Sequence, residues 1–287
     1  MRSKLFVPAS RPELFSKAEA SQADAISFDL EDAVEESKKD EARQHLAAYL
    51  QQVDPRAINK VLVVRVNPID SEHFKADVEA IAQKSLAIIN IPKVESADQV
   101  RLVAELLKDV EARRGLSQPI GILANIESPL GLHRAVEIAM ADSRVVGLQI
   151  GYGDLFAPAG IVSGEPSATQ YVRVAVKMAA AAAGVQAYDG AYVNIANKEG
   201  YRQDAAAANA LGYAGKSCIH PTQIELANEV FRPADQTIKH ALEVIEAAEK
   251  AQAAGVGAFV VNGRLVDGPF IAEAYRTVEL ARKLGLA

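Results

Sequence analysis

Cysteine is almost absent from this chain, which has 287 residues and one cysteine, Cys218. A single thiol cannot form a disulfide within the chain, and this is typical of proteins in a reducing cytoplasm. Without a second sulfur or a pair of histidines, Cys218 does not indicate a zinc site either. We therefore expect a cytoplasmic protein whose fold depends on neither disulfides nor zinc.

Long apolar runs and an excess of positive charge are also missing. No window approaches about 18 consecutive apolar residues, so we expect no membrane span. The opening segment MRSKLFVPASRPE lacks the apolar stretch of a signal peptide. The formal net charge is −6, whereas nucleic acids are bound by basic surfaces. These absences argue against membranes and nucleic acids as main partners.

Short apolar runs alternate regularly with longer segments of helical pattern. Hydrophobic residues make up 49% of the chain, enough for a sizeable core. The clearest runs, such as AISFDL and VLVVRV, are nearly continuous, as in strands buried on both faces of a parallel sheet. The predicted strands are 4–7, 25–30, 61–66, 87–91, 120–126, 145–150, 185–188 and 217–219.

The segments between these strands are amphipathic or rich in alanine. Eight strands alternating with helices predict an α/β fold, a closed (β/α)₈ TIM barrel. No GxGxxG motif follows the first strand, which disfavours the alternative of a doubly wound open sheet. The predicted helices are 14–21, 37–51, 71–83, 97–114, 131–141, 171–183 and 203–211.

The chain continues well past the eighth predicted strand. We expect a helix over 235–254, a hairpin over 258–266 around Asn262–Gly263, and a last helix over 270–284. Residues 1–230 are therefore predicted to form the barrel. Residues 231–287 are predicted to form a C-terminal helical extension that serves as a lid or an oligomer contact. This extension either belongs to the same structural domain or is swapped onto a neighbouring subunit.

Polar and charged residues follow nearly every predicted strand. Catalytic groups of (β/α)₈ barrels lie at the C-terminal ends of the strands. Converging like charges are costly unless a cation or a substrate compensates them. This ring therefore predicts an active site, and its members are Pro8 with Arg11, Glu31 with Asp32, Arg65 with Asn67, Lys93 with Glu95, Glu127, Asp154, Asp189 and His220.

The ring offers mainly oxygen donors, which indicates a hard cation. Mg²⁺ is usually held by one or two carboxylates together with water and substrate oxygens. Glu127 and Asp154, which end neighbouring strands, are the predicted metal ligands. Arg65 ends a strongly apolar strand and needs an anionic partner, and its guanidinium can hold a carboxylate with two parallel hydrogen bonds.

Each of these residues also has an ordinary structural interpretation. Glu31–Asp32 could simply start a helix, and Lys93 with Glu95 could form a loop ion pair of little energetic value. Asp189 and His220 could be turn residues. A single carboxylate after a strand is more often a helix cap than a ligand. The joint pattern, however, is far less expected by chance than any one member.

Seven segments, found in this order, carry a family resemblance: RSKLFVPASRPELFSKA, FDLEDAV, VRVNP, IPKVES, IESPLG, GYGDL and KSCIHPTQ. Over residues 2 to about 285, the chain resembles the citrate lyase beta-subunit-like branch of the HpcH/HpaI aldolase superfamily. The resemblance implies a TIM barrel, Mg²⁺ (for which Mn²⁺ can substitute) and coenzyme A as part of the substrate. It also implies a homotrimer or hexamer.

The resemblance assigns roles to particular positions. Glu127 and Asp154 match the metal ligands, and Arg65 matches a substrate-binding arginine with a catalytic role. Glu31 and Asp32 match the acidic pair that borders the metal and holds its waters.

Four further positions match residues that meet coenzyme A or move a proton. Phe6, Arg11 and Lys17 match contacts to the coenzyme A nucleotide, and Asp267 matches a catalytic aspartate on a C-terminal lid. Gly153 departs from the pattern, since many members carry an acidic residue before the metal-binding aspartate. This departure leaves the acceptor acid open.

The implied activity is reversible carbon–carbon cleavage by a lyase. A thioester of the citryl-CoA, citramalyl-CoA or malyl-CoA type would give acetyl-CoA, or another acyl-CoA, and a 2-oxo acid. Three alternatives stay open. They are a 2-oxo-acid aldolase independent of coenzyme A, a citrate lyase beta subunit acting on an acyl-carrier thioester, and a catalytically idle binding protein.

Overall fold

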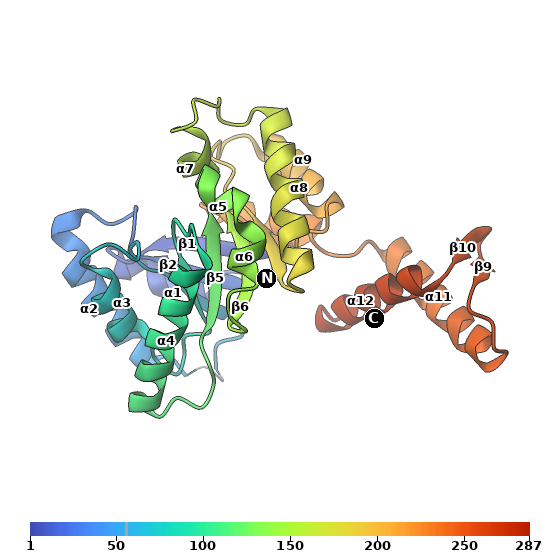
Figure 1. Ribbon diagram of the computed structural model, residues 1–287, viewed down its shortest axis with the longest axis horizontal. Coiled ribbons are helices and arrows are strands. Elements are labelled where there is room, and N and C mark those ends of the chain that lie inside the picture. Colours follow the sequence, from blue (N-terminus) through green and yellow to red (C-terminus); the bar gives the residue numbers. More distant parts are fainter. Residues whose placement is uncertain (55–56) are drawn as a thin grey trace. The chain divides into compact units, whose positions relative to one another are not determined.

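A computed structural model of the chain describes residues 1–54 and 57–287. The chain forms two compact units, Met1–Phe231 and Arg232–Ala287. Figure 1 shows the helices and strands of both units along the chain. None of the helices in the described residues is long and apolar enough to cross a lipid bilayer.

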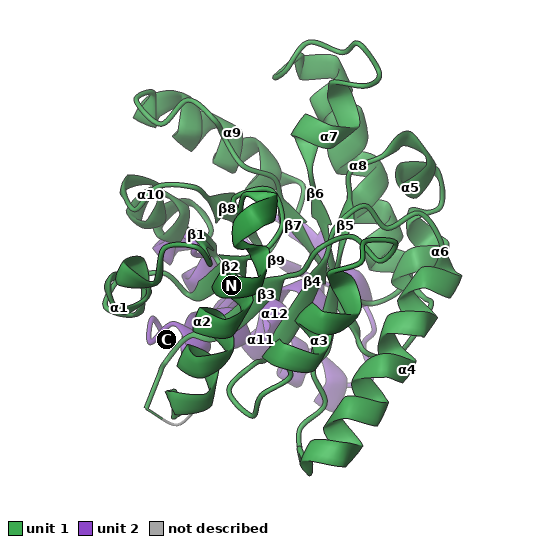
Figure 2. Cartoon of the chain, turned by 90° about the vertical axis from the view of Figure 1, so that its left-hand side faces the viewer, with its two compact units in different colours: residues 1–231 green, residues 232–287 purple. Residues whose placement is uncertain are grey.

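Eight parallel strands of the first unit close into a barrel in sequence order. Each strand pairs with the next, and β1 pairs with β8 to complete the ring. Figure 2 shows these strands at the centre of the first unit, with helices around them. The predicted TIM barrel is confirmed, with strands β1 Ser3–Pro8, β2 Ala25–Asp29, β3 Val61–Arg65, β4 Ile88–Ile91, β5 Gly121–Ile126, β6 Val145–Ile150, β7 Gln186–Asp189 and β8 Gly215–Cys218.

The helices of this unit follow the strands along the chain. They are α1 Phe15–Glu19, α2 Lys39–Gln52, α3 Phe74–Ile81, α4 Ala97–Arg114, α5 Pro129–His133, α6 Ala135–Ala139, α7 Tyr152–Phe156, α8 Pro166–Ala182, α9 Lys198–Ala210 and α10 Thr222–Val230. Two short 3₁₀ helices, Pro12–Leu14 and Glu36–Lys38, precede α1 and α2.

Three of the predicted helices differ most from the structure, and the short helices α7 and α10 were not predicted. The helix predicted over 171–183 begins at Pro166, because the Glu165 side chain accepts the Ala168 N–H and caps an earlier start. The predicted helix 131–141 is divided into α5 and α6 at Arg134, whose φ of −101° and ψ of 14° depart from helical values. The guanidinium of Arg134 donates to the Glu95 carbonyl at this junction. The helix predicted over 203–211 begins at residue 198, because the Asn197 side chain accepts the Gly200 N–H and caps an earlier start.

The barrel interior has an apolar lower part and a polar middle layer. The lower part is a cluster of Ala25, Val63, Ile88, Leu123 and Tyr188. Branched apolar residues dominate most barrel interiors. Here the middle layer instead contains six buried polar side chains, Lys4, Ser27, Asn90, Asn125, Gln149 and Ser217.

The second unit is a helical hairpin with a small β-ribbon. It contains α11 Asp235–Ala253, β9 Phe259–Val261, β10 Arg264–Val266 and α12 Gly268–Lys283. The two strands pair antiparallel through Asn262 and Gly263, which both have positive φ as the turn requires. Its apolar core consists of Ala241, Val244, Val261, Val266, Ala274 and Val278.

Candidate active site

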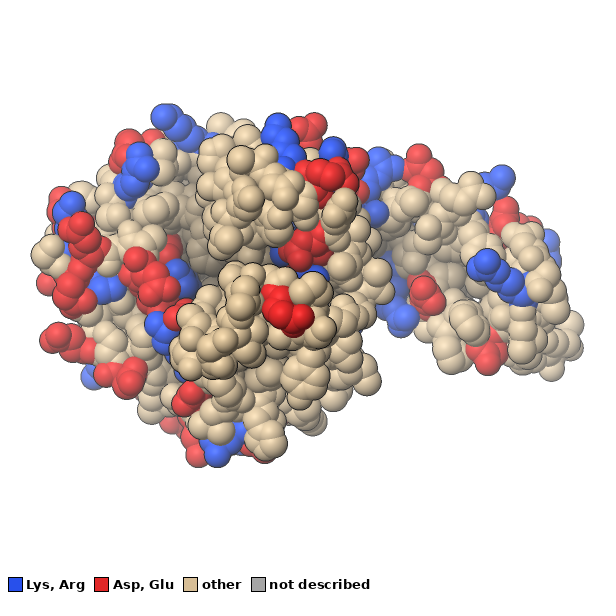
Figure 3. All heavy atoms as spheres, turned by 90° about the horizontal axis from the view of Figure 1, so that it is seen from above, with Lys and Arg blue, Asp and Glu red and all other residues tan. Residues whose placement is uncertain are grey.

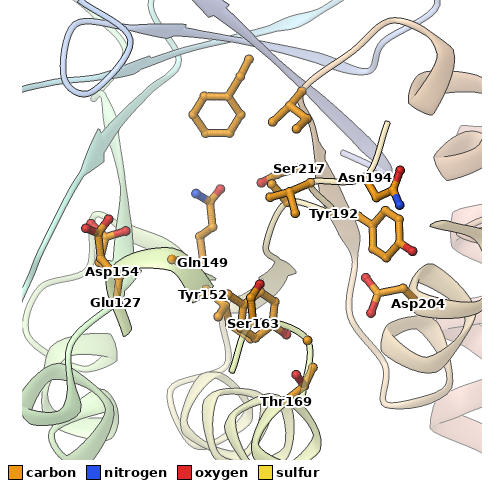
Figure 4. Close-up of a pocket in the computed structure, with 18 of the residues that line it drawn as sticks. Glu127, Gln149, Tyr152, Asp154, Ser163, Thr169, Tyr192, Asn194, Asp204 and Ser217 are labelled. Atoms are coloured by element: carbon orange, nitrogen blue, oxygen red, sulfur yellow. The ribbon is translucent and has the colours of Figure 1, made fainter. Parts of the chain in front are cut away.

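A cavity of about 1090 Å³ lies at the C-terminal ends of the barrel strands. Glu127 follows β5, Asp154 lies in α7 after β6, and Arg65 ends β3. All three side chains line this cavity, as the sequence predicted for residues at strand ends. Figure 4 shows Glu127 and Asp154 close together, both at the same side of the cavity.

The Glu127 carboxylate is buried and firmly oriented. Its Oε1 accepts the Lys93 backbone N–H at 2.7 Å, and its Oε2 accepts a hydrogen bond from Asn125 Nδ2 at 3.2 Å. Burial raises the pKa of Glu127 to about 7, and the negative charges of Glu31 and Asp154 add to this rise. A bound cation would remove this cost by compensating the carboxylates.

The backbone around Glu127 leaves room for its carboxylate and little else. A Cβ atom at Gly151 would lie 2.1 Å from Glu127 Oε2, so this position requires glycine. Lys93 adopts a φ of 51°, which is rare for a residue with a side chain, and from there presents its N–H to the carboxylate. Two carboxylates beside an open cavity fit a hard divalent cation that keeps water or substrate oxygens.

The anionic partner that Arg65 needs is supplied by the protein itself. Asp29 accepts two parallel hydrogen bonds, from Arg65 Nε at 2.8 Å and from Nη2 at 2.6 Å. Arg65 Nη1 lies 2.7 Å from Glu31 Oε2. The pair of parallel hydrogen bonds that we expected Arg65 to donate to a substrate carboxylate is therefore donated to Asp29. The guanidinium faces the cavity as a fixed positive charge with fewer free N–H groups than expected.

Glu31 and Asp32 differ in their surroundings. Glu31 is only 4% exposed and also accepts a hydrogen bond from Lys93 Nζ at 2.8 Å. Burial raises the pKa of Glu31, while Arg65 and Lys93 oppose the rise. Asp32 is exposed and lies 3.4 Å from Arg65 Nη1. Both acids line a shallower hollow next to the main cavity.

The three predicted coenzyme A contacts are not together. Phe6 lines the main cavity, and its ring lies 4.5 Å from Lys4 Nζ and 5.4 Å from the Arg65 guanidinium carbon. Arg11 is exposed and pairs with Glu13. Lys17 lies exposed on α1. Neither Arg11 nor Lys17 is among the side chains that line the cavity.

Other members of the predicted ring have structural roles. Asp189 is fully buried and pairs with Lys216 and with Arg173, whose Nη2 is 2.8 Å away. Burial works against the charge of Asp189, but the two cations lower its pKa. His220 is bonded to Thr222 within its own loop. Asp267 immediately precedes α12 in the second unit, and its Oδ1 has no hydrogen-bond partner among the described residues.

Sequence reasoning missed Asp29 and the buried polar layer. Asp29 is the last residue of β2 and stands level with Arg65 in the neighbouring strand β3. Opposite charges at equivalent positions of adjacent strands were the available signal. Asn90, Asn125 and Gln149 each interrupt an apolar run as a single polar residue.

Sequence comparison with known proteins finds one matching family and relatives that are named as lyases. A sequence model of the HpcH/HpaI aldolase/citrate lyase family matches residues 2–221. The citrate lyase subunit beta of Haemophilus influenzae is 37% identical over 98% of this chain and 97% of its own length. The L-malyl-CoA/beta-methylmalyl-CoA lyase of Rhodobacter capsulatus is 34% identical over 98% of this chain and 95% of its own length.

A solved structure agrees with these matches. Protein CitE of Mycobacterium tuberculosis, in complex with magnesium, acetoacetate and coenzyme A, superposes with a TM-score of 0.77 and is 32% identical. The superposition covers 98% of this chain and 100% of that one. By sequence and by fold, the chain belongs to the HpcH/HpaI aldolase/citrate lyase family.

Proposed function

We propose that the protein is a Mg²⁺-dependent carbon–carbon lyase that cleaves or forms a 3-hydroxyacyl-CoA thioester. The observation that carries the proposal is the meeting of Glu127, Asp154 and Arg65 in one cavity at the strand ends. Relatives are named as lyases of citrate and of malyl-CoA, and a solved relative holds magnesium and coenzyme A. The products are an acyl-CoA, such as acetyl-CoA, and a 2-oxo acid.

Glu127 and Asp154 hold the metal in this proposal, and Mn²⁺ can replace Mg²⁺. A bound divalent ion supplies Lewis-acid polarisation and orients substrate oxygens. Glu31 and Asp32 would border the ion and accept hydrogen bonds from its waters. The pairing of Glu31 with Arg65 and Lys93 keeps that carboxylate in place.

Arg65 stabilises the negative charge that develops on the thioester oxygen as the carbon–carbon bond breaks. Because Asp29 fixes the guanidinium, this charge is in position before the substrate binds. Asp267 exchanges the proton at the acyl carbon as general acid and base. Phe6 packs on the acyl-CoA, while Arg11 and Lys17 meet its phosphates where the nucleotide leaves the cavity.

We further propose a homotrimer or hexamer in the cytoplasm, with residues 232–287 serving as a lid for a neighbouring subunit. Apolar side chains on α8 and at the C-terminal end of α6, two helices that pack together, support an oligomer contact. Tyr171, Val174, Met178 and Met140 are 68%, 42%, 66% and 63% exposed, and such patches usually mark interfaces. Where charged side chains occur on the face in Figure 3, acidic and basic residues lie near one another.

The test is thioester cleavage with and without Mg²⁺ on citryl-CoA, citramalyl-CoA, malyl-CoA and methylmalyl-CoA. We expect metal-dependent release of a 2-oxo acid from at least one of them. Glu127→Gln should abolish turnover, whereas Glu225→Gln, at an exposed carboxylate of α10, should leave it unchanged. No cleavage of any thioester by a folded, Mg²⁺-saturated protein would refute the proposal.

One second candidate has a specific observation in its favour. The 37% identity to a citrate lyase subunit beta is compatible with a subunit that acts on an acyl-carrier thioester. Carbon–carbon cleavage of a citryl group attached to a carrier protein, which releases oxaloacetate and leaves an acetyl group on the carrier, without cleavage of the corresponding CoA thioester, would establish this role.

A further inference from the structure

A chain of hydrogen bonds crosses the barrel interior and ends on Glu127. Lys4 Nζ donates to Gln149 Oε1. Gln149 Nε2 donates to Asn125 Oδ1 at 3.0 Å, and Asn125 Nδ2 donates to the Glu127 carboxylate at 3.2 Å. We call Lys4, Gln149 and Asn125 the polar chain.

The polar chain is buried throughout. Lys4, Gln149 and Asn125 are 1%, 3% and 1% exposed. Burial lowers the pKa of Lys4, and the nearby Arg65 charge lowers it further. Among the described residues, Lys4 forms no ion pair with a carboxylate. Burial of a lysine without such a pair lowers the stability of the fold. An apolar residue at position 4 would therefore stabilise the core more, unless the N–H groups of Lys4 are needed for another role.

Each link of the chain sets the direction of the next. A lysine Nζ donates to Gln149, so the amide oxygen faces Lys4 and the amide nitrogen faces Asn125. Asn90 Nδ2 donates to the same Asn125 oxygen at 2.7 Å. With its oxygen filled by two donors, the Asn125 amide can present only N–H to the carboxylate of Glu127.

The opposite orientation would be unfavourable for the site. If the Gln149 amide turned, its oxygen would face the oxygen of Asn125, and relief of that contact would turn Asn125 as well. An amide oxygen would then face the carboxylate at the position where N–H donates now. The carboxylate would move, and the neighbouring Gly151 leaves it little other space.

We propose that this buried chain, from Lys4 through Gln149 and Asn125, positions the Glu127 carboxylate to receive the divalent cation. The three residues are positioning residues, because none is assigned a contact with the substrate. The inference rests on the proposed function in one respect, namely that Glu127 is a metal ligand. Partners that orient metal ligands typically contribute about 10–100-fold to metal affinity.

The experiment measures Mg²⁺ affinity of the full-length protein by isothermal titration calorimetry, without substrate. Lys4→Met and Gln149→Met keep the approximate volume of each side chain while breaking the chain. Each should weaken Mg²⁺ binding by about tenfold. Ser27→Ala is the matched control, because Ser27 lies in the same buried layer and its hydroxyl has no hydrogen-bond partner among the described residues. Its Mg²⁺ affinity should stay within twofold of the unsubstituted protein.

The double variant Lys4→Met/Gln149→Met tests whether Lys4 and Gln149 act on Mg²⁺ affinity in series or independently of each other. If the residues act in series, the double variant should bind Mg²⁺ as weakly as Gln149→Met alone. Additive losses would overturn the chain. Lower melting temperatures with unchanged Mg²⁺ affinity would also overturn it, by showing that Lys4 and Gln149 only stabilise the fold.

Failure of the underlying proposed function gives a different result. If Glu127→Gln leaves Mg²⁺ binding unchanged, Glu127 is not a metal ligand, and the proposed function itself fails. Binding that Glu127→Gln abolishes, but that Lys4→Met and Gln149→Met leave intact, would refute only the positioning chain.

Discussion

The raised pKa of Glu127 predicts a specific pH dependence of stability in the metal-free protein. The folded protein binds this proton with a pKa of about 7, whereas an unfolded chain releases it near 4.5. Between these values the folded state holds more protons than the unfolded state. Stability contributed by the protonated group is therefore complete below pH 4.5 and is lost as the pH rises to about 7.

The size of the effect follows from the two pKa values. A rise of the pKa from 4.5 to about 7 corresponds to about 3 kcal/mol of lost stability at high pH. For a domain of this size, about 3 kcal/mol shifts the melting temperature by roughly 6–12 °C. Glu127→Gln removes the titrating group while keeping the side-chain length. The free energy of unfolding of this variant should therefore not decrease by this amount as the pH rises.

The assay is urea unfolding followed by circular dichroism in EDTA, from pH 5 to pH 8. The quantity of interest is the free energy of unfolding of Glu127→Gln minus that of the unsubstituted protein. We expect this difference to increase by about 2–3 kcal/mol over the range. Comparing the difference at several pH values cancels any constant effect of the substituted amide on packing.

Saturation with Mg²⁺ supplies the control. At a Mg²⁺ concentration 100 times the dissociation constant, the unsubstituted protein should regain about 2.7 kcal/mol at pH 8. Glu127→Gln should gain much less. A difference that stays constant with pH would refute the reasoning, because it would mean that the Glu127 carboxylate is not destabilised by its burial.

Three further substitutions have distinct expected outcomes. Gly151→Ala places a methyl group 2.1 Å from the nearby carboxylate oxygen, so Mg²⁺ affinity by calorimetry should fall at least about tenfold; unchanged affinity would contradict the geometry. Arg65→Lys should lower kcat/KM about 100-fold in the cleavage assay, with the same Mg²⁺ affinity; full activity would exclude the electrostatic role. Asp189→Ala leaves the buried cations Arg173 and Lys216 with Asp204 as their one remaining carboxylate partner among the described residues, so one buried positive charge is uncompensated and urea unfolding should show a loss of about 3–5 kcal/mol; a loss below about 1 kcal/mol would count against a structural ion cluster.

The barrel could be predicted because its strands are nearly continuous apolar runs separated by helical patterns. The seventh and eighth predicted strands, 185–188 and 217–219, also fell close to the observed β7 and β8. The boundaries of α5, α6, α8 and α9 were missed because side-chain caps and a local break at Arg134 decide them. These are interactions of one or two residues that a periodic pattern does not record.

The candidate site was predictable where a charge follows a strand. Glu127, Asp154 and Arg65 follow or end apolar strands, so barrel geometry alone brings them to one cavity. Asp29 was missed because it lies inside the predicted strand 25–30. Without it, a substrate carboxylate was the expected anionic partner of Arg65, whereas the structure pairs Arg65 with Asp29. Asp189 was placed in the predicted ring because the two buried cations that pair with it, Arg173 and Lys216, are distant from it in sequence.

The paired hydrogen bonds between Arg65 and Asp29 also have a consequence for inhibitor binding. A free arginine side chain carries about 2 kcal/mol of rotamer entropy, and most of this is already lost here on folding. An anionic inhibitor that contacts the guanidinium therefore does not need to immobilise it. Removal of Asp29 would restore that mobility, and inhibitor binding would then show a less favourable entropy at a similar contact enthalpy.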